Sequence, residues 1–411
     1  MSQKTQSAGV VVLGVAFEYF DLMLVNLMAS SMIHHFIGSE NTNVIKIYSF
    51  LAYAIAFLFR PLGAILFGSI GDLIGRKQAL LASMFLMSLA TLGIALIPSH
   101  SSIGVLSCLL FFFCRICQGL SVGGEYGTAM TYAYEMNPAL RTFYGACVVS
   151  SSHLGGVFAS LLASLFNKNF QVPFLIGGLL GLALFAFRSL LQEQAPVKRT
   201  TANDLFKKTL SQRGSILKSA IVSASMVFVF YGTLIYLNEW IHTQLHVERS
   251  DIFRYNTILL LFWVLIPPTL GYLIDRLEVK YTQVMLLGSV GICVMSPILC
   301  FSMLRGVYPL VLFSQMGLHL FLMLMSLGTP RFFGDLFSKS TRTTGISASY
   351  SLGASLTSAI APLLCHAFVE GFASPFGLLV PLLIVGLGSA CVFANCLLGK
   401  DGVSEYENER H

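Results

Sequence analysis

Charged residues are scarce in this chain of 411 residues, of which only 11% are Asp, Glu, Lys or Arg. Soluble globular proteins carry about 25% charged residues, and disordered chains are poor in apolar residues. A sequence that is 55% hydrophobic fits neither class. The low charge content therefore excludes a soluble domain and a disordered segment, and it indicates a protein that crosses a membrane several times.

Paired cysteines are also lacking. All nine Cys residues lie within apolar runs, where Cys behaves as a small hydrophobe. Only Cys114 and Cys117 have CxxC spacing, and no second pair accompanies them. We therefore expect no disulfide framework and no metal site. The net charge of +6 comes from basic residues scattered between apolar runs, which indicates topology signals and no nucleic-acid partner.

Long apolar runs dominate what is present. A bilayer core about 30 Å thick requires roughly 20 apolar residues per helix. Runs of this length predict twelve transmembrane helices, at about 8–33, 47–71, 78–97, 102–130, 142–166, 172–191, 216–240, 255–275, 284–303, 308–332, 344–369 and 376–398. The first run is predicted to be a helix and not a signal peptide, because Glu18 and Asp21 interrupt its apolar core.

Lys and Arg are distributed unequally between the connections. With a cytoplasmic amino terminus, most of the 25 basic residues lie in the termini and the even-to-odd connections. The positive-inside rule then predicts that both ends are cytoplasmic. The predicted organisation is an all-α membrane protein with two pseudo-symmetric bundles of six helices, at 1–191 and 216–398, joined by a cytoplasmic linker at 192–215 and followed by a cytoplasmic tail at 399–411.

A loop pattern recurs about 200 residues apart. Gly68-Ser-Ile-Gly-Asp72 and Gly271-Tyr-Leu-Ile-Asp275 both read G-x-x-x-D, with the two Asp residues 203 positions apart. Arg141 and Arg342 open predicted helices 5 and 11, with an offset of 201 positions. Such landmarks indicate duplication of a six-helix unit, which is how many secondary transporters are built.

The loop residues have a local physical interpretation. Gly68 and its neighbour Gly71 allow close helix approach, and Asp72 either pairs with nearby basic residues or caps a neighbouring helix. The motif is interpreted as a topological anchor or as a latch that holds one access state. The expected gating residues are Gly68, Asp72, Gly75, Arg76, Lys77, Arg141, Asp275, Arg276 and Arg342.

Several motifs resemble one family. The loop Gly68 to Lys77 is similar to the signature of the major facilitator superfamily. Three further stretches resemble its metabolite:proton symporter family, namely Phe17-Glu18-Tyr19-Phe20-Asp21, Phe59-Arg60-Pro61-Leu62-Gly63-Ala64, and Arg115-Ile-Cys-Gln118-Gly119-Leu-Ser121-Val-Gly123-Gly124-Glu125-Tyr126-Gly127. The last of these is long and specific, and together the resemblances cover nearly the whole chain.

The resemblance implies a proton-coupled importer in the bacterial cytoplasmic (inner) membrane, with substrates such as proline, betaine, 2-oxoglutarate, citrate or shikimate. The partners expected are a small molecule, protons and the lipid bilayer, for a chain that functions as a monomer. The coupling ion is the proton and no cofactor is expected. The chain departs from the family in the Glu193-Gln194-Ala195-Pro196 stretch, where a T-P pair is usual, and in its short carboxy-terminal tail.

Five ionisable residues lie at membrane depth in the first half: Glu18, Asp21, Arg60, Arg115 and Glu125. A charge at the bilayer centre costs at least about 2.5–3.5 kcal/mol on insertion scales, so opposite charges are expected to pair. With all five ionised the set carries −1, and one proton neutralises it. We expect Asp21 or Glu18 to carry the proton, with Asp21 favoured for its central depth and Glu125 as a further candidate.

Substrate contacts are expected in both halves. Arg115 and Arg60 are candidates for a substrate carboxylate, because guanidinium groups bind carboxylates in a bidentate way. The second half lacks Lys and Arg at mid-membrane depth, and its polar side chains are predicted to hydrogen-bond the substrate. The full predicted substrate set is Arg115, Arg60, Gln118, Tyr231, Tyr236, Asn238, Gln315 and His319.

The predicted function is secondary active transport, by proton-coupled symport of a small carboxylate-bearing metabolite through alternating access. An enzyme is not expected, because no span carries HExxH, a nucleophile elbow or a phosphate loop. An exporter or uniporter of a small polar solute with the same fold is the alternative.

Overall fold

The computed structural model describes residues 3–38, 41–166, 169–189 and 201–398. The predicted stretch Glu193–Pro196 and the predicted tail 399–411 lie outside these residues. The described residues are helical without β-strands, and twelve of their helices are long and apolar enough to cross a membrane. The all-α fold class and the twelve membrane helices predicted from the sequence are therefore confirmed.

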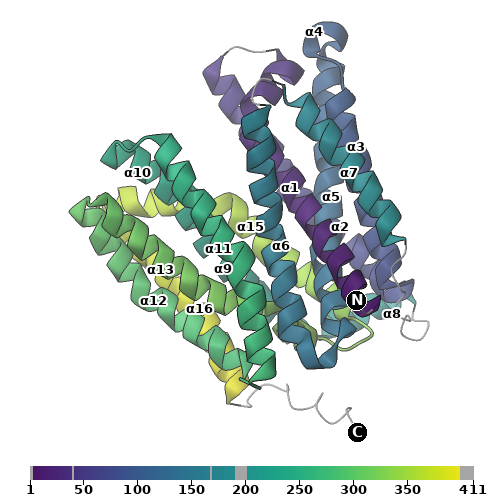
Figure 1. Ribbon diagram of the computed structural model, residues 1–411, viewed down its shortest axis with the longest axis vertical. Helices are drawn as coiled ribbons and strands as arrows, with labels where there is room; N and C mark the ends of the chain where they lie inside the picture. The colour runs from purple at the N-terminus through teal and green to yellow at the C-terminus, as the bar shows by residue number, and fades with distance from the viewer. Residues whose placement is uncertain (1–2, 39–40, 167–168, 190–200, 399–411) are drawn as a thin grey trace. The chain divides into compact units, whose positions relative to one another are not determined.

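Two compact units make up the chain (Figure 1). Unit 1 consists of Met1–Met136, Ser150–Ser211 and Lys339–Ser351. Its helices are α1 (Gln3–Ile37), α2 (Thr42–Leu73), α3 (Arg76–Leu96), α4 (His100–Ile103), α5 (Val105–Met136), most of α6 (Arg141–Leu165), α7 (Gln171–Arg188), α8 (Ala202–Ser211) and the first turns of α15 (Arg342–Gly371).

Unit 2 consists of Asn137–Val149, Gln212–Ser338 and Leu352–His411. Its helices are η1 (Pro138–Leu140), the start of α6, α9 (Arg213–Tyr231), the π-helical η2 (Gly232–Tyr236), α10 (Leu237–Leu245), α11 (Arg249–Arg276), α12 (Tyr281–Arg305), α13 (Tyr308–Leu327), α14 (Thr329–Leu336), the rest of α15, η3 (Pro375–Leu378) and α16 (Leu379–Leu397). Helices α6 and α15 thus contribute residues to both units.

Close contact between α2 and α5 holds unit 1 together. A Cβ atom at Gly119 or Gly123 of α5 would collide with the backbone of α2 at Ala56 or Arg60. A Cβ at Gly63 of α2 would collide with the backbone at Leu120. Small residues of this kind let membrane helices approach within backbone contact. The glycine stripe of α5 is therefore a packing surface, as its four-residue spacing predicts.

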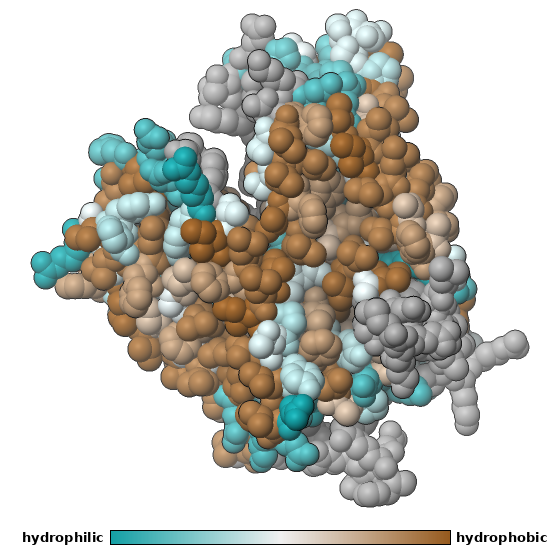
Figure 2. Space-filling model, viewed as in Figure 1, coloured by the Kyte–Doolittle hydropathy of each residue, from teal (hydrophilic) through white to brown (hydrophobic). Residues whose placement is uncertain are grey.

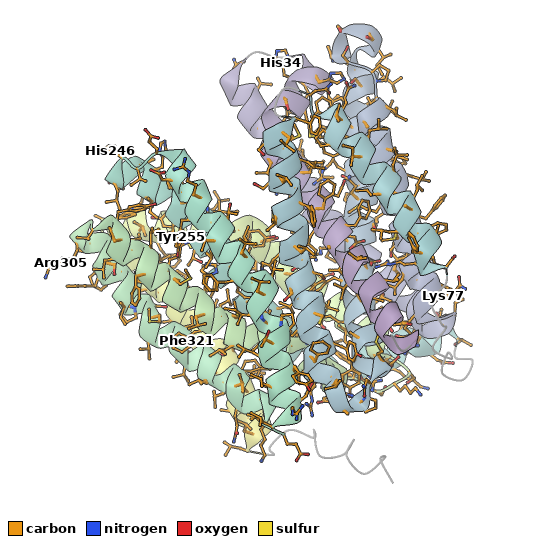
Figure 3. All side chains as sticks on the ribbon, in the orientation of Figure 1. His34, Lys77, His246, Tyr255, Arg305 and Phe321 are labelled. Atoms are coloured by element: carbon orange, nitrogen blue, oxygen red, sulfur yellow. The ribbon has the colours of Figure 1, made fainter. Side chains whose placement is uncertain are left out.

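Apolar side chains cover much of the visible surface of each unit, and hydrophilic residues gather toward the helix ends (Figure 2). This distribution suits a lipid-facing protein, because the hydrocarbon core accepts apolar side chains without a solvation cost. His34 and Lys77 lie at opposite ends of unit 1 (Figure 3). The end with Lys77 carries the turn between α2 and α3, which Arg76 and Lys77 follow as the first residues of α3.

Two spans and the linker differ in detail from the prediction. The run predicted at 308–332 is two helices, because α13 ends at Leu327 and Thr329-Pro330 starts α14. Proline suits this first turn, where its missing N–H would have no helical partner. The run predicted at 216–240 contains the π-helical η2. The segment 192–215, predicted to be a linker, contains the helix α8. This helix was not predicted.

Candidate functional site

A buried polar relay joins α1, α3 and α5 within unit 1. Thr91 of α3 donates a hydrogen bond of 2.6 Å from its Oγ1 to Asp21 Oδ1 of α1. Gln118 of α5 donates from Nε2 to the other oxygen, Asp21 Oδ2. Arg115, one turn before Gln118 on α5, donates from Nη1 to Gln118 Oε1 at 2.6 Å and from Nε to the Ala52 carbonyl at 3.0 Å.

The arginine fixes the orientation of the Gln118 amide. A guanidinium has only donors, so the atom that faces Arg115 must be the Gln118 oxygen. The amide nitrogen, which only donates, then faces Asp21 and lies 3.2 Å from Thr91 Oγ1. Asp21 therefore accepts a hydrogen bond on each of its two oxygens, an arrangement that suits an ionised carboxylate. Arg115 acts on Asp21 through Gln118.

Glu18 has a different environment from Asp21, although both lie on α1. Ser121 Oγ is 2.9 Å from Glu18 Oε1 and 2.8 Å from the Ser83 carbonyl oxygen. Among the described residues, no donor reaches Glu18 Oε2. A hydroxyl carries one hydrogen, so Ser121 donates either to an ionised Glu18 or to the Ser83 carbonyl. In the second case a protonated Glu18 donates to Ser121, and the same geometry serves both states.

Glu125 forms a buried ion pair with Arg188 at the end of α7. Arg188 Nη2 contacts Glu125 Oε1, and both side chains are fully buried. Ser83 donates to the other oxygen, Glu125 Oε2, at 2.7 Å. The guanidinium also donates to the carbonyl of Leu80 at 3.1 Å. Glu125 is thus held by a direct ionic partner, in contrast to Glu18.

Arg188 is a buried charged residue that the sequence analysis did not identify. It is the last residue of α7 and lies near the end of the run predicted at 172–191. In the structure its guanidinium points into unit 1 and occupies the space beside Gly14, where a Cβ atom would collide with it. The glycine on α1 opposite Glu125 was the available signal for a large side chain in this position.

The charge of the buried set changes with Arg188. The analysis of the sequence gave five groups with a total of −1. Besides Asp72 and Arg76 of the loop motif, six described charged side chains of unit 1 are buried, namely Glu18, Asp21, Glu125, Arg60, Arg115 and Arg188. Three carboxylates and three guanidinium groups sum to zero when all are ionised. With Arg188 included, one proton gives the set a charge of +1.

Arg60 of α2 lies among aromatic rings. Its Nη2 donates to the Tyr19 hydroxyl at 3.3 Å, and its guanidinium carbon is 5.5 Å from the centre of the Tyr350 ring and 5.8 Å from that of Phe57. The Tyr126 ring is tilted by 37° relative to the Tyr350 ring, with centroids 4.7 Å apart. Aromatic faces attract a cation without cancelling its charge. These contacts thus hold a buried guanidinium in a charged form.

A second polar cluster lies in unit 2 around His319 of α13. Trp263 of α11 donates from Nε1 to His319 Nδ1 at 3.2 Å, and an indole nitrogen only donates. The hydrogen of a neutral His319 is therefore on Nε2, which lies 2.9 Å from Thr233 Oγ1 in η2. Thr233 donates in turn to the Val229 carbonyl at 2.6 Å. This cluster is satisfied with a neutral imidazole.

Gln315 lies one turn before His319 and contacts the same π-helical segment. Its Nε2 donates to the Thr233 carbonyl at 3.1 Å, which fixes the amide orientation. Gln315 is fully buried, and among the described residues no donor reaches its Oε1. Asn238 at the start of α10 likewise has a buried Oδ1 that no described donor reaches. Both amide oxygens are acceptors to which a ligand hydrogen can be donated.

The two predicted tyrosines of this region lie near η2. Tyr236, in η2 itself, is buried, and its ring lies 6.3 Å from that of His366. Tyr231, the last residue of α9, makes an edge contact with Phe230 at 5.3 Å. Phe230 also contacts the His319 ring at 5.8 Å. The structure therefore brings Tyr231 and Tyr236 to the segment that holds the His319 cluster.

The loop motif of unit 1 is built around Asp72. Its two oxygens accept from the backbone N–H groups of Thr343 at 3.2 Å and Thr344 at 2.8 Å, at the start of α15. A carboxylate at a helix amino terminus is favoured by the helix dipole and by the unpaired N–H groups there. Arg76 lies 3.4 Å from Asp72. Asp72 therefore both pairs with a basic residue and caps a helix.

Other residues of this loop serve the same contact. A Cβ atom at Gly68 would lie 2.9 Å from the Thr344 Cα, which confirms that glycine is needed for close approach. Gly75, which separates α2 from α3, has a φ of 154°, a conformation that favours glycine. Arg342 and Arg76 both pair with Glu135, at 2.8 and 3.3 Å. Lys77 begins α3 beside Arg76.

The matching motif of unit 2 has a different basic partner. Asp275 Oδ2 accepts from the Phe143 N–H at 2.8 Å, near the start of α6, which Arg141 opens. Asp275 Oδ1 lies 3.0 Å from Arg331 Nη1 of α14. Arg276 is exposed and donates to the Tyr272 hydroxyl on its own helix at 3.0 Å. The sequence analysis expected Arg276 at this loop but did not identify Arg331 as the partner.

Twelve helices long and apolar enough to cross a membrane, with charged side chains buried among them, define a multi-pass membrane protein. Among the described residues, no group of three or more His, Cys, Asp or Glu side chains is arranged to hold a metal ion. Residues 11–327 match the family model described as Major Facilitator Superfamily. The chain belongs to the major facilitator superfamily.

Proteins of similar sequence are named as transporters, and a solved structure has the same fold. A putative proline/betaine transporter of Staphylococcus haemolyticus is 27% identical over 96% of this chain and 89% of its own length. The alpha-ketoglutarate permease of Escherichia coli is 28% identical over 70% of this chain and 69% of its own. The proton:xylose symporter XylE has the same fold, with a TM-score of 0.75 at 15% identity over 96% of this chain and 95% of its own.

Proposed function

We propose that this protein is a proton-coupled symporter that takes up a small carboxylate-bearing metabolite, such as an organic acid, an amino acid or a betaine, by alternating access. Its relatives are named for proline, betaine and alpha-ketoglutarate, and each of these molecules bears a carboxylate. The proposed location is the bacterial cytoplasmic (inner) membrane, with both termini in the cytoplasm. The observation that carries the proposal is the balanced set of six buried charges in unit 1.

Charge balance explains why a proton and a carboxylate would move together. An uncompensated charge in a low-dielectric interior is costly. A proton alone gives the set a charge of +1, and a carboxylate alone gives it −1. Binding a proton and a monoanionic cargo restores zero, so the protein loaded with both closes at least cost, and the account favours a monoanion over a zwitterion or a dianion. This arrangement disfavours the movement of either species without the other.

Glu18 is proposed to carry the proton. Its partner Ser121 serves both protonation states, and its second oxygen is buried without a described donor. The sequence analysis favoured Asp21 as the proton carrier. Asp21 accepts hydrogen bonds from Thr91 and Gln118 and is proposed to stay ionised. Glu125 is proposed to be structural, since it is paired with Arg188.

Arg60 and Arg115 are proposed to attract the substrate carboxylate. Arg60 is buried in unit 1 and lies against the rings of Phe57 and Tyr350, which favour a charged guanidinium, and this supports a role toward an anion. Gln315 and Asn238 are proposed to accept hydrogen bonds from the remainder of the substrate. The Asp72 and Asp275 caps are proposed as latches whose breaking accompanies the change of access.

The test uses purified protein in proteoliposomes, with labelled proline, betaine, 2-oxoglutarate, citrate and shikimate. Symport predicts that an inward proton gradient drives accumulation of at least one of them, and that a protonophore abolishes it. Equilibration without accumulation indicates a uniporter. Accumulation driven only by an outward proton gradient indicates an exporter, and either result contradicts the proposal.

Charge movement provides a second and sharper test. A monoanionic substrate carried with one proton is predicted to generate no current, and a zwitterion carried with one proton is predicted to generate an inward positive current. Both are measured with a voltage-sensitive dye in the same vesicles. A current of equal size for both substrates contradicts the charge-balance account while leaving proton coupling intact.

A further inference from the structure

Helix α8 has three distinct faces. Leu205 and Thr209, four residues apart, are buried, and α8 packs against α2. Phe206 and Leu210, also four apart, lie on the adjacent face and are 56% and 59% exposed. The third face carries the exposed Lys207 together with Lys208, Asp204 and Ser211. Residues four apart share one face of a helix, so each of these groups is contiguous.

The exposed apolar face is not part of a membrane span. α8 has only ten residues, and it lies outside the twelve candidate spans. An exposed Phe and Leu side by side on a short helix are costly in water. The buried face of α8 is already covered, so Phe206 and Leu210 require a different apolar environment.

Charge and position identify that environment. Within unit 1, α8 lies toward the end that carries Lys77 (Figures 1 and 3). Lys207 borders the apolar face, Lys208 lies on the opposite side of the helix next to the buried face, and the exposed Arg213 follows at the start of α9. The acidic Asp204 is engaged by the hydroxyl of Thr201 at 2.7 Å. A basic margin beside an apolar face suits an anionic lipid surface.

We propose that α8 is an interfacial helix that binds anionic phospholipid at the surface of the membrane. Phe206 and Leu210 enter the boundary between headgroups and acyl chains, and Lys207 contacts the phosphates. Long lysine side chains reach headgroups while their methylene stems lie along apolar surface. The surface is separate from the buried charges of unit 1, and the assignment does not depend on the transported substrate.

Fluorescence quenching in the full-length protein tests the position of the helix. Phe206→Trp introduces a reporter on the apolar face, and Ser211→Trp is the matched control on the polar face. Both are reconstituted in vesicles that contain phospholipid brominated near the headgroup end of its acyl chains, and the signal of the wild-type protein is subtracted. Quenching severalfold stronger for Phe206→Trp is expected. Equal quenching of the two reporters, or none for Phe206→Trp, overturns the proposal.

Lipid charge tests the identity of the partner. The Phe206→Trp quenching is compared in vesicles of phosphatidylcholine alone and in vesicles that also contain phosphatidylglycerol. We expect stronger quenching with phosphatidylglycerol, and we expect Lys207→Gln/Lys208→Gln to remove that difference. Quenching that is independent of phosphatidylglycerol, or unchanged in the double lysine variant, overturns the assignment to anionic lipid. A reporter that is shielded from lipid in both membranes assigns the face to a protein partner instead.

Discussion

The polar cores of the two units differ in kind. Apart from the Asp72–Arg76 pair of the loop motif, unit 1 buries three carboxylates and three guanidinium groups, several of which are linked by Ser, Thr and Gln side chains. Unit 2 buries a neutral set around His319, in which one indole and one hydroxyl satisfy the imidazole. We propose that the first arrangement exchanges a proton and attracts an anion, and that the second donates and accepts hydrogen bonds.

The largest expected effect on stability comes from breaking the buried Glu125–Arg188 ion pair of unit 1. The described polar core around His319 in unit 2 has no corresponding pair. Removing one partner of a buried ion pair costs about 3–5 kcal/mol, because the other charge is left without compensation. Arg188→Met is therefore expected to destabilise the protein by about this amount. The measurement is the thermal midpoint of unfolding of the purified protein in detergent.

A double variant separates charge from packing in the same experiment. Glu125→Met/Arg188→Met removes both charges, and Ser83 retains the Leu80 carbonyl as an acceptor at 3.3 Å. The double variant is expected to unfold at a higher temperature than Arg188→Met alone. A single variant as stable as the wild type contradicts the ion pair, and a double variant no better than the single one contradicts its electrostatic origin.

A smaller effect is expected for the glutamine of the charged core. Gln118→Leu removes the amide that connects Arg115 to Asp21, and it leaves charged groups with fewer partners. Leaving a buried polar group unsatisfied costs about 1–3 kcal/mol, and more for a charged one. The thermal midpoint is again the measurement. An unchanged midpoint and an unchanged substrate affinity contradict the relay.

The matched glutamine of the neutral core is expected to have the smallest effect. Gln315→Leu removes one hydrogen bond to the Thr233 carbonyl, and a neutral hydrogen bond contributes about 1 kcal/mol. Substrate affinity is expected to fall while the dependence of uptake on the proton gradient stays the same. If Gln315→Leu changed the dependence of uptake on the proton gradient as strongly as a variant of unit 1 does, the proposed division of roles between the two polar cores would be contradicted.

Much of the fold follows from local sequence pattern. The length and apolar character of each run predict a membrane helix, and the periodic glycines of α5 predict close contact with a neighbour. The acidic pair Glu18 and Asp21 and the arginines Arg60 and Arg115 were predicted at membrane depth because they interrupt apolar runs. All four are buried in unit 1.

The arrangement of those side chains was beyond the sequence. Arg188 ends its apolar run, so its position alone does not tell whether it points to water or turns inward to Glu125. The different surroundings of Glu18 and Asp21 depend on Ser121, Thr91 and Gln118, which come from other helices. Arg331 as the partner of Asp275 likewise depends on the tertiary fold.

The central claim is that Glu18 carries the coupling proton. Accumulation of substrate in proteoliposomes with an inward gradient of one pH unit, followed by counterflow of labelled substrate without a gradient, tests it most directly. One pH unit corresponds to an accumulation of about tenfold for one proton per substrate. The account predicts that Glu18→Gln keeps counterflow but no longer accumulates substrate, and Asp21→Asn is expected to lose both. Full gradient-driven accumulation by Glu18→Gln would contradict it.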